Sequence, residues 1–282
     1  MDFGQDVVAL EKGDRLLFQL LFSRFCNHAI ISLADTYNCA APIGRIIFGV
    51  DWMGVGVPRI ERGLIDNGVY HVLNRGNARQ TVFDDGADYS SFAALLKEAR
   101  NRYSVHILAY CLMPNHFHLV MQPERGEALS RFMQWLLTSH VRRYHQRRGT
   151  SGHVWQGRYK SFLIQRDAHL LIAIRYVERN PVRAELVRSA ADWWWSSHQT
   201  RMGKAHSEIL DPCPVMLPGD WGEYVDQPLS ESDLTSLRRS VNRQSPYGSA
   251  QWQGKVSIEH GLQATLRPRG RPRKMRDESR KK

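Results

Sequence analysis

The sequence predicts an α+β fold in which an antiparallel sheet carries helices on one face. The first observation is that short apolar segments with strand-like alternation recur through the middle of the chain. The second is that two longer segments between them place apolar residues three or four positions apart, which is typical of amphipathic helices. The third is that two of the strands are separated only by a tight turn, so we expect them to pair in opposite directions.

The first half of the predicted domain supplies two strands and a helix. The segment 69–73, Val-Tyr-His-Val-Leu, is the first strand, and the polar, glycine-bearing loop 74–77 follows it. Residues 89–103 place four apolar side chains at helical spacing, so we expect an amphipathic helix there. The segment 105–113 is apolar at nearly every position, as expected of an inner strand.

The second half repeats this pattern. A turn at Pro114 and Asn115 returns the chain as a strand over 116–122, and a second helix is expected over 129–146 with most of its arginines outward. A further strand is expected over 155–164. The resulting order, β-α-β-β-α-β, is the ferredoxin-like arrangement, which leaves the sheet face opposite the two helices available for a site.

A third helix is expected after Asp167, whose carboxylate suits a helix N-cap. It carries Tyr176 and, four residues later, Asn180 directly before Pro181. Side chains four apart are neighbours on one face of a helix, so Tyr176 and Asn180 can point at a common atom. The alternatives are a core tyrosine with a solvated hydroxyl and an Asn-Pro pair that merely ends the helix.

Two histidines share one face of the strand 116–122. Successive side chains of a strand point to opposite faces, so His116 and His118 lie side by side, while Phe117 and Leu119 occupy the other face. Neutral imidazole is a common metal ligand, and a rigid strand fixes the separation of the rings. The pair is a candidate half-site for a divalent cation, and the alternative is that two polar residues merely alternate on a half-buried strand.

The charge of the chain favours a polyanionic partner, because its formal net charge is +11. No acidic residue lies within 128–166. We expect the basic residues of this run to form a surface that tracks phosphates, since a solvated basic helix normally has acids interspersed. They are Arg131, Arg142, Arg143, Arg147, Arg148, Arg158, Lys160 and Arg166.

The cysteines and the apolar segments indicate a cytoplasmic protein. The 4 cysteines show no Cys-x-x-Cys spacing, so we expect reduced thiols rather than a zinc ribbon or a disulfide framework. No apolar run reaches the roughly 18 residues that span a bilayer. The apolar segment 16–25 lacks the small-residue cleavage site of a signal peptide. We expect no membrane association and, given the charge, association with the nucleoid.

Two distant segments together resemble a known family. Pro-Asn-His-Phe-His-Leu-Val at 114–120 and Arg-Tyr-Val-Glu-Arg-Asn-Pro-Val-Arg-Ala at 175–184 resemble the single-tyrosine HUH transposases, in which two histidines flank a bulky apolar residue. Within that group the chain is most similar to the REP-associated tyrosine transposases. The resemblance covers roughly 59–197, about half of the chain. Supporting matches are Tyr70-His71-Val72, Asn74-Arg75-Gly76-Asn77, the strand from Trp155 to Ser161, and Trp195-Ser196-Ser197.

The resemblance implies roles for individual residues. His116 and His118 would bind a divalent cation, Mg²⁺ or Mn²⁺, and Tyr176 would attack a DNA phosphodiester to give a 5′-phosphotyrosine and a free 3′-hydroxyl. Asn180, one turn after the tyrosine, would help to hold the cation, although relatives differ there and some use Gln. Glu178 lies about 200° round the helix from Tyr176, so we do not expect it to act as a base.

The resemblance also implies that the substrate is single-stranded DNA, often folded as a hairpin. Basic groups interleaved with aromatic ones suit backbone contacts combined with base stacking. For Trp155, packing in the core is the open alternative. The residues expected to bind DNA are Arg75, Trp155, Arg158, Lys160, Arg183, Arg269 and Arg271.

The predicted domain organisation has an N-terminal extension, a central catalytic part and a basic C-terminal tail. The last part contains Pro268-Arg269-Gly270-Arg271-Pro272, which resembles an AT-hook that enters the minor groove of A·T-rich duplex DNA. The alternative is a basic tail that binds phosphates nonspecifically. The expected parts are 1–52, an extension that is either native or an upstream mis-start before Met53; 53–200, the transposase domain; 201–229, a proline-rich linker; 230–262, a small helical segment capped by Ser230 or Ser232; and 263–282, the tail.

Two other functions fit the same residues. The chain is either a strand transferase, a domesticated protein that binds hairpins without useful turnover, or a metal-assisted nuclease in which water attacks and Tyr176 only packs. A covalent protein-DNA adduct on a denaturing gel distinguishes the first from the other two. The sequence leaves open whether the protein acts as a monomer or a homodimer.

Overall fold

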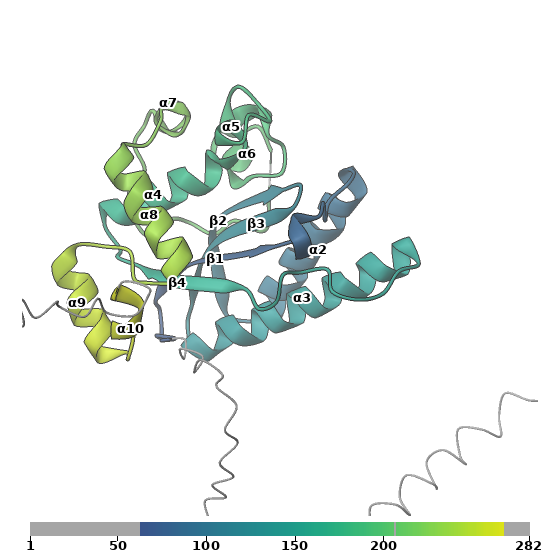
Figure 1. Ribbon diagram of the computed structural model, residues 1–282. Coiled ribbons are helices and arrows are strands. Elements are labelled where there is room, and N and C mark those ends of the chain that lie inside the picture. The colour runs from purple at the N-terminus through teal and green to yellow at the C-terminus, as the bar shows by residue number, and fades with distance from the viewer. Residues whose placement is uncertain (1–62, 206, 268–282) are drawn as a thin grey trace, which may run out of the picture. The chain divides into compact units, whose positions relative to one another are not determined.

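The centre of the molecule is a four-stranded sheet in the order β2-β3-β1-β4 (Figure 1). The structure is a computed structural model that describes residues 63–205 and 207–267. Every neighbouring pair of strands is antiparallel. The strands β1 and β2 therefore run in the same direction on either side of β3. The strands are β1 Val69–Arg75, β2 Val105–Met113, β3 His116–Pro123 and β4 Lys160–Ile164.

Helices pack on both faces of this sheet. Helices α2, Gly86–Arg102, and α3, Gly126–Arg148, pack together on one face (Figure 1). Helix α4, Ala168–Glu178, packs on the other face against β2 and β3. The element order and the antiparallel sheet confirm the predicted α+β fold.

Alternation along the strands sorts the core into two apolar layers. Phe117 and Leu119 of β3 are fully buried in the layer that contains Phe92 of α2. Val120, which points the other way, is buried in the layer that contains Ile174 of α4. Burial on both faces makes the sheet a rigid support for side chains at its edges and ends.

Local signals in the sequence fix where the helices begin and end. The carboxylate of Asp85 accepts hydrogen bonds from the backbone N–H groups of Ala87 and Asp88 and caps α2. Asp167 caps α4 in the same way, as predicted. Helix α3 ends where Gly149 adopts a left-handed conformation with φ 62°, which glycine tolerates without strain.

The last strand begins later than predicted. Residues 155–159 are not part of a ladder, because Trp155 forms only an isolated bridge with Gly76 and Gly157 adopts a φ of 94° that interrupts the extended chain. The strand β4 starts at Lys160. The irregular segment before it passes beside the end of β1, where the amide of Asn77 donates to the carbonyl of Val154 at 2.8 Å.

The segment 201–229, predicted as a linker, packs against the domain instead. The carboxylate of Asp211 accepts hydrogen bonds from Arg100 Nε at 2.9 Å and from the backbone N–H of Ile107 at 2.8 Å. Further on, α7 buries Trp221 and Val225. Apolar and charged contacts therefore fix a segment whose prolines alone suggested a free connection, while the domain limits themselves stay predictions.

Shorter elements complete the described chain. Helix α8 matches the predicted helix after residue 230, and the hydroxyl of Ser230 caps it. These elements are the 3-10 turns Asn77–Arg79 and Ala190–Asp192, and the helices α5 Asn180–Arg183, α6 Ser197–Arg201, α7 Trp221–Asp226, α8 Glu231–Arg243, α9 Ala250–Glu259 and α10 Gln263–Leu266.

Three predictions lie outside the described residues: the status of 1–52, and the DNA-binding roles of Arg269 and Arg271 in the tail. Within 63–205 and 207–267, none of the helices has both the length and the apolar character needed to cross a membrane.

Candidate active site

The two histidines of β3 lie on the sheet face that α4 covers. Alternation along β3 sends Phe117 into the opposite layer, so His116 and His118 point the same way. Their ring centroids are 5.0 Å apart with the ring planes at 83°. His118 is buried and His116 is partly exposed, which leaves one side of the pair open to a substrate.

Helix α4 brings Tyr176 to this pair. The ring centroid of Tyr176 lies 5.9 Å from that of His118. The guanidinium of Arg183, on the short helix α5, lies 5.5 Å from the centroid of the Tyr176 ring. The structure thus brings together the histidines and the tyrosine that lie far apart in the sequence, as predicted, with a cation beside the phenol.

A third histidine, His71 on β1, belongs to the same cluster and was missed as a site residue. Its Nε2 atom is 2.8 Å from Nδ1 of His118, and its side chain is fully buried. The centroid of its ring is 6.0 Å from that of Tyr176. The signal was present in the sequence, because strand alternation on β1 and the pairing of β1 with β3 place His71 on the face of His118.

A hydrogen bond determines which nitrogen of His116 is free, and one of the two tautomers of the His71–His118 pair frees the same nitrogen of His118. The amide nitrogen of Asn115 donates to the carbonyl of Arg79 at 3.1 Å, so its Oδ1 atom faces His116 Nδ1 at 2.7 Å. An amide oxygen only accepts, and His116 must therefore carry its proton on Nδ1 and keep a lone pair on Nε2. His118 has the same free Nε2 when its Nδ1–H donates to His71 Nε2.

Burial keeps these imidazoles neutral. It lowers the pKa of His116 to about 4, with a smaller effect from the nearby charges of Arg75 and Arg183. Burial lowers the pKa of His71 to about 3 and that of His118 well below its usual value. Neutral rings are what a metal ion requires, because only the unprotonated nitrogen is a ligand.

The donor set fits a divalent cation in part. Two free Nε2 atoms from one rigid strand form a half-site, and each ring is oriented through its other nitrogen, as metal-binding histidines usually are. Within the described part of the chain, no group of three His, Cys, Asp or Glu side chains is placed to hold a metal. The remaining ligands would therefore come from an amide oxygen, water or the substrate.

Asn180 is buried at the start of α5, four residues after Tyr176. Its amide nitrogen donates to the backbone carbonyls of Tyr176 at 2.9 Å and Val177 at 3.4 Å. Its Oδ1 atom accepts a hydrogen bond from Arg183 at 2.6 Å. These bonds tie Tyr176 to Arg183, and the role of Asn180 as a metal ligand stays a prediction.

Glu178 faces away from the site, as expected from its position on α4. Its buried carboxylate accepts hydrogen bonds from Trp221 Nε1 at 2.8 Å, Arg201 Nε at 2.8 Å and the hydroxyl of Ser197, and it lies 3.0 Å from His198 Nδ1. Burial raises the pKa of Glu178, but its hydrogen bonds and the charge of Arg201 outweigh burial and lower it. This ionised group fixes α4 to α6 and α7.

The basic run on α3 is partly neutralised, which corrects the expected phosphate-tracking surface. Acids from outside the run pair with its arginines: Arg147 binds Asp85 and Asp88, and Arg148 binds Asp84 and Asp88. These pairs could not be seen in the sequence, because the acids lie at the start of α2, far from the run along the chain. The cations of the run that make no ion pair with a described residue are Arg142, Arg158, Lys160 and Arg166.

The predicted DNA-binding residues divide into exposed cations and one core residue. Arg75, Arg158, Lys160 and Arg183 are exposed. Trp155 is only 5% exposed, and the rings of Phe117, His140 and other aromatics pack around it. Trp155 therefore packs in the core, which was the alternative left open for it. The faces of its ring are not free to stack on bases.

Comparisons with known proteins identify the family of the chain. Residues 65–180 match the family model described as "Transposase IS200 like". A REP-associated tyrosine transposase of Haemophilus influenzae is 30% identical over 151 residues, which cover 49% of this chain and 80% of that protein.

Two solved structures are similar more loosely. One is a REP-associated tyrosine transposase bound to a REP hairpin, with 16% identity, a TM-score of 0.45, and coverage of 58% of this chain and 100% of that one. The other is a transposase from Deinococcus radiodurans, with 15% identity, a TM-score of 0.31, and coverage of 53% and 100%. The match to the Haemophilus protein confirms the family resemblance of the sequence, and the chain belongs to the REP-associated tyrosine transposases.

Proposed function

We propose that this transposase cleaves and rejoins single-stranded DNA through a 5′-phosphotyrosine on Tyr176, with the help of a divalent cation, Mg²⁺ or Mn²⁺. The observation that carries the proposal is the approach of the Tyr176 ring to the His118 ring, with centroids 5.9 Å apart. A buried phenol and paired imidazoles from distant segments lie on one sheet face, and His116, the outer imidazole of the pair, is partly exposed.

His116 and His118 would hold the cation through their Nε2 atoms. When bound there, a divalent cation offsets the charge of the phosphate oxygens and orients the group for attack. Asn115 fixes the proton of His116 on Nδ1, and in the tautomer that this proposal requires His118 donates from Nδ1 to His71. The chain itself thus sets the geometry of the half-site before any ligand arrives.

Tyr176 acts as the nucleophile in this proposal. Its hydroxyl loses a proton to solvent, its oxygen forms a bond to phosphorus, and the bond from phosphorus to the 3′-oxygen breaks, so that the leaving strand ends in a 3′-hydroxyl. Arg183 stabilises negative charge that develops on the phenol, and Asn180 holds Arg183 in place. The retained phosphodiester energy allows a second hydroxyl to reverse the step and join a new end.

Hairpin-forming repeat DNA is the proposed substrate. The family is named for its association with such repeats, and the exposed cations Arg75, Arg158 and Lys160 can contact the phosphates of a strand that reaches His116. Arg75 is the register partner of His116 across β1 and β3, which puts a cation at the mouth of the site.

A covalent-adduct assay tests the proposal. Full-length protein is incubated with Mn²⁺ and labelled single-stranded hairpin DNA and then run on a denaturing gel. We expect a labelled protein band that disappears in Tyr176→Phe, while DNA binding is retained because the ring remains. Tyr103→Phe is the matched control, since Tyr103 lies at the end of α2 on the other side of the sheet. Cleaved DNA without any adduct would indicate attack by water, and binding without cleavage would indicate a hairpin-binding protein.

A further inference from the structure

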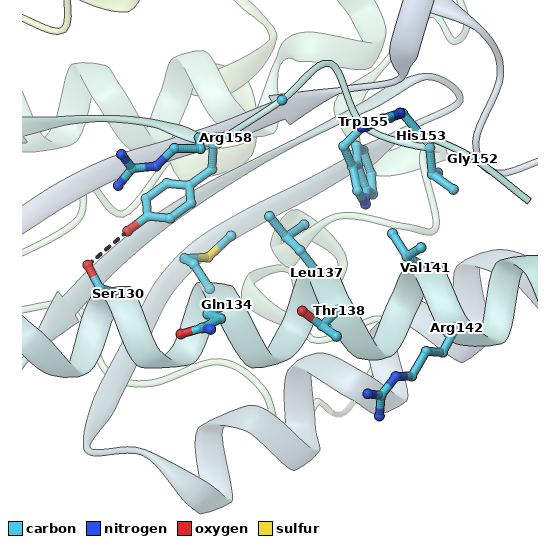
Figure 2. A pocket seen from close by; sticks show the side chains of 14 residues that line it. Ser130, Gln134, Leu137, Thr138, Val141, Arg142, Gly152, His153, Trp155 and Arg158 are labelled. Atoms are coloured by element: carbon cyan, nitrogen blue, oxygen red, sulfur yellow. Dashed lines mark hydrogen bonds between the residues drawn. The ribbon is translucent and has the colours of Figure 1, made fainter. Parts of the chain in front are cut away.

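A cavity of about 630 Å³ lies between α3 and the irregular segment 152–159 (Figure 2). We call it the α3 cavity. Its walls include Met133, Leu137, Val141 and Val154. Two of these residues, Met133 and Val154, belong to the apolar layer beneath α2 and α3, on the opposite side of the sheet from Tyr176. Its volume is within the range of pockets that hold small organic groups.

The cavity contains a polar atom that the protein leaves without a partner. The indole nitrogen of Trp155 is buried and makes no hydrogen bond. Figure 2 shows this nitrogen turned toward α3, between Leu137 and Val141. A buried N–H donor without an acceptor costs free energy, so an occupant with an acceptor atom in its plane would be stabilised there.

The mouth of the cavity is cationic. Arg142 and Arg158 line it and are exposed, and neither makes an ion pair with a residue of the described ranges. No acidic residue lines the cavity. This distinguishes the mouth from the distal part of α3, where Arg147 and Arg148 are occupied by aspartates. An occupant with negative charge on either side of it therefore suits the cavity.

Backbone contacts connect the cavity to the catalytic histidines. Trp155 pairs with Gly76 in an isolated bridge, and the amide of Gly76 donates to the carbonyl of Asn115 at 2.8 Å. The side chain of Asn115 in turn binds His116. The cavity and the histidines therefore lie on opposite faces of the sheet but are joined through the same end of β1 and the β2-β3 turn.

We propose that the α3 cavity takes one unpaired nucleobase of the bound DNA strand, entering edge first. A base has flat apolar faces that suit the aliphatic walls, ring-edge oxygens that accept from Trp155 Nε1, and flanking phosphates that suit Arg142 and Arg158. The base must be unpaired, because a paired base has its acceptors engaged and its edge covered. The inference rests on the proposed function, since it requires that DNA is the substrate.

The contact with Trp155 is tested by NMR on full-length Tyr176→Phe protein, which leaves the strand intact. The indole N–H signal of Trp155, one of 8 tryptophans, is assigned by its loss in Trp155→Phe. We expect saturating oligo(dT) to shift this signal downfield, and an abasic oligonucleotide of the same length to leave it in place. An unmoved signal with oligo(dT), or an equal shift with the abasic strand, would overturn the proposal.

Occupancy of the cavity is tested by blocking it. Thr138 is exposed at the mouth, so Thr138→Trp fills the opening without changing the core. We expect about tenfold weaker binding of oligo(dT) and unchanged binding of the abasic strand, because only the base contact is lost. Gln146→Trp, on an exposed position of α3 outside the cavity, is the control. Wild-type binding of oligo(dT) by Thr138→Trp, or equal weakening for both strands, would reject the site.

These measurements are independent of the adduct assay. If oligo(dT) shifts the Trp155 N–H signal and Thr138→Trp weakens binding, but no adduct forms, the base-binding cavity is supported and strand transfer is rejected. An adduct with neither effect would retain strand transfer and reject the cavity.

Discussion

The two faces of the sheet use the same strands for different purposes. On β3, Phe117 faces α2 and α3 and is buried among apolar side chains, whereas its neighbours His116 and His118 face α4 and Tyr176. The side chains on the face toward α2 and α3 form an apolar core, and those on the face toward α4 form the candidate site. A shift of register by a single residue would exchange the two sets of side chains. The comparison predicts that substitutions on the two faces separate stability from activity.

The largest effect is expected from His118→Ala, which removes one arm of the half-site. Loss of several kcal/mol of charge stabilisation corresponds to a fall of about a thousandfold in the rate of strand cleavage. The rate is measured in a single turnover with excess enzyme and Mn²⁺, and normalised to the folded fraction. A rate within tenfold of the wild type would show that the imidazole pair does not hold the cation.

The opposite pattern is expected from Phe117→Ala, one position earlier on the other face. Phe117 is fully buried, so its truncation leaves a cavity and lowers the free energy of unfolding by about 3–5 kcal/mol. Urea denaturation measures the loss. The cleavage rate of the protein that remains folded should stay near the wild-type value, and a large decrease in that rate would mean that the faces are not independent.

A smaller effect is expected from His71→Ala, because His71 acts through His118. Removing the partner of a metal-binding histidine lowers metal affinity or activity by about 10-fold to 100-fold. The Mn²⁺ concentration at half-maximal cleavage should rise, and His71→Gln should recover part of the loss, since its amide oxygen can accept from His118 Nδ1. A loss of stability without any change in the Mn²⁺ requirement would make His71 a packing residue only.

The smallest effect is on the pH dependence of stability. Burial lowers the pKa of His140, on the α3 side, to about 4. Its folded pKa is below its unfolded value of about 6.5, so the unfolded chain binds more protons, and stability falls as the pH drops from about 6.5 toward 4 by up to about 1.4 kcal/mol per pH unit. Urea denaturation at pH 7 and pH 5 should show a shallower dependence in His140→Phe. If His140→Phe left the pH dependence of stability unchanged, His140 would not be the group responsible for it.

Local patterns predicted the fold and the core of the site, because alternation and caps act over a few residues. The strand that carries His116 and His118, and the cap of α4 at Asp167, are both of this kind. The missed features depend on contacts between distant segments. The bond between His71 and His118 requires the pairing of β1 with β3, and the neutralisation of Arg147 and Arg148 requires α2 beside α3.

The contacts of the segment 201–229 could not be predicted for the same reason. Its prolines indicate a connection, whereas the salt bridge from Arg100 to Asp211 and the buried Trp221 are visible only in three dimensions. The prediction for Trp155 rested only on the residue types around it in the sequence. A tryptophan among basic residues suggested base stacking, but in the structure other rings of the core cover its faces.

The ionised carboxylate of Glu178 has a consequence for how the protein can be dissected. The match to the family model ends at residue 180, yet the groups that contact the carboxylate of Glu178, on Ser197, His198, Arg201 and Trp221, all follow it. Truncation at residue 180 would remove every one of these partners together with α6 and α7, which cover the carboxylate. We therefore expect a version truncated at residue 180 to lose order at the end of α4, which carries Tyr176, and a version that extends through α7 to keep it.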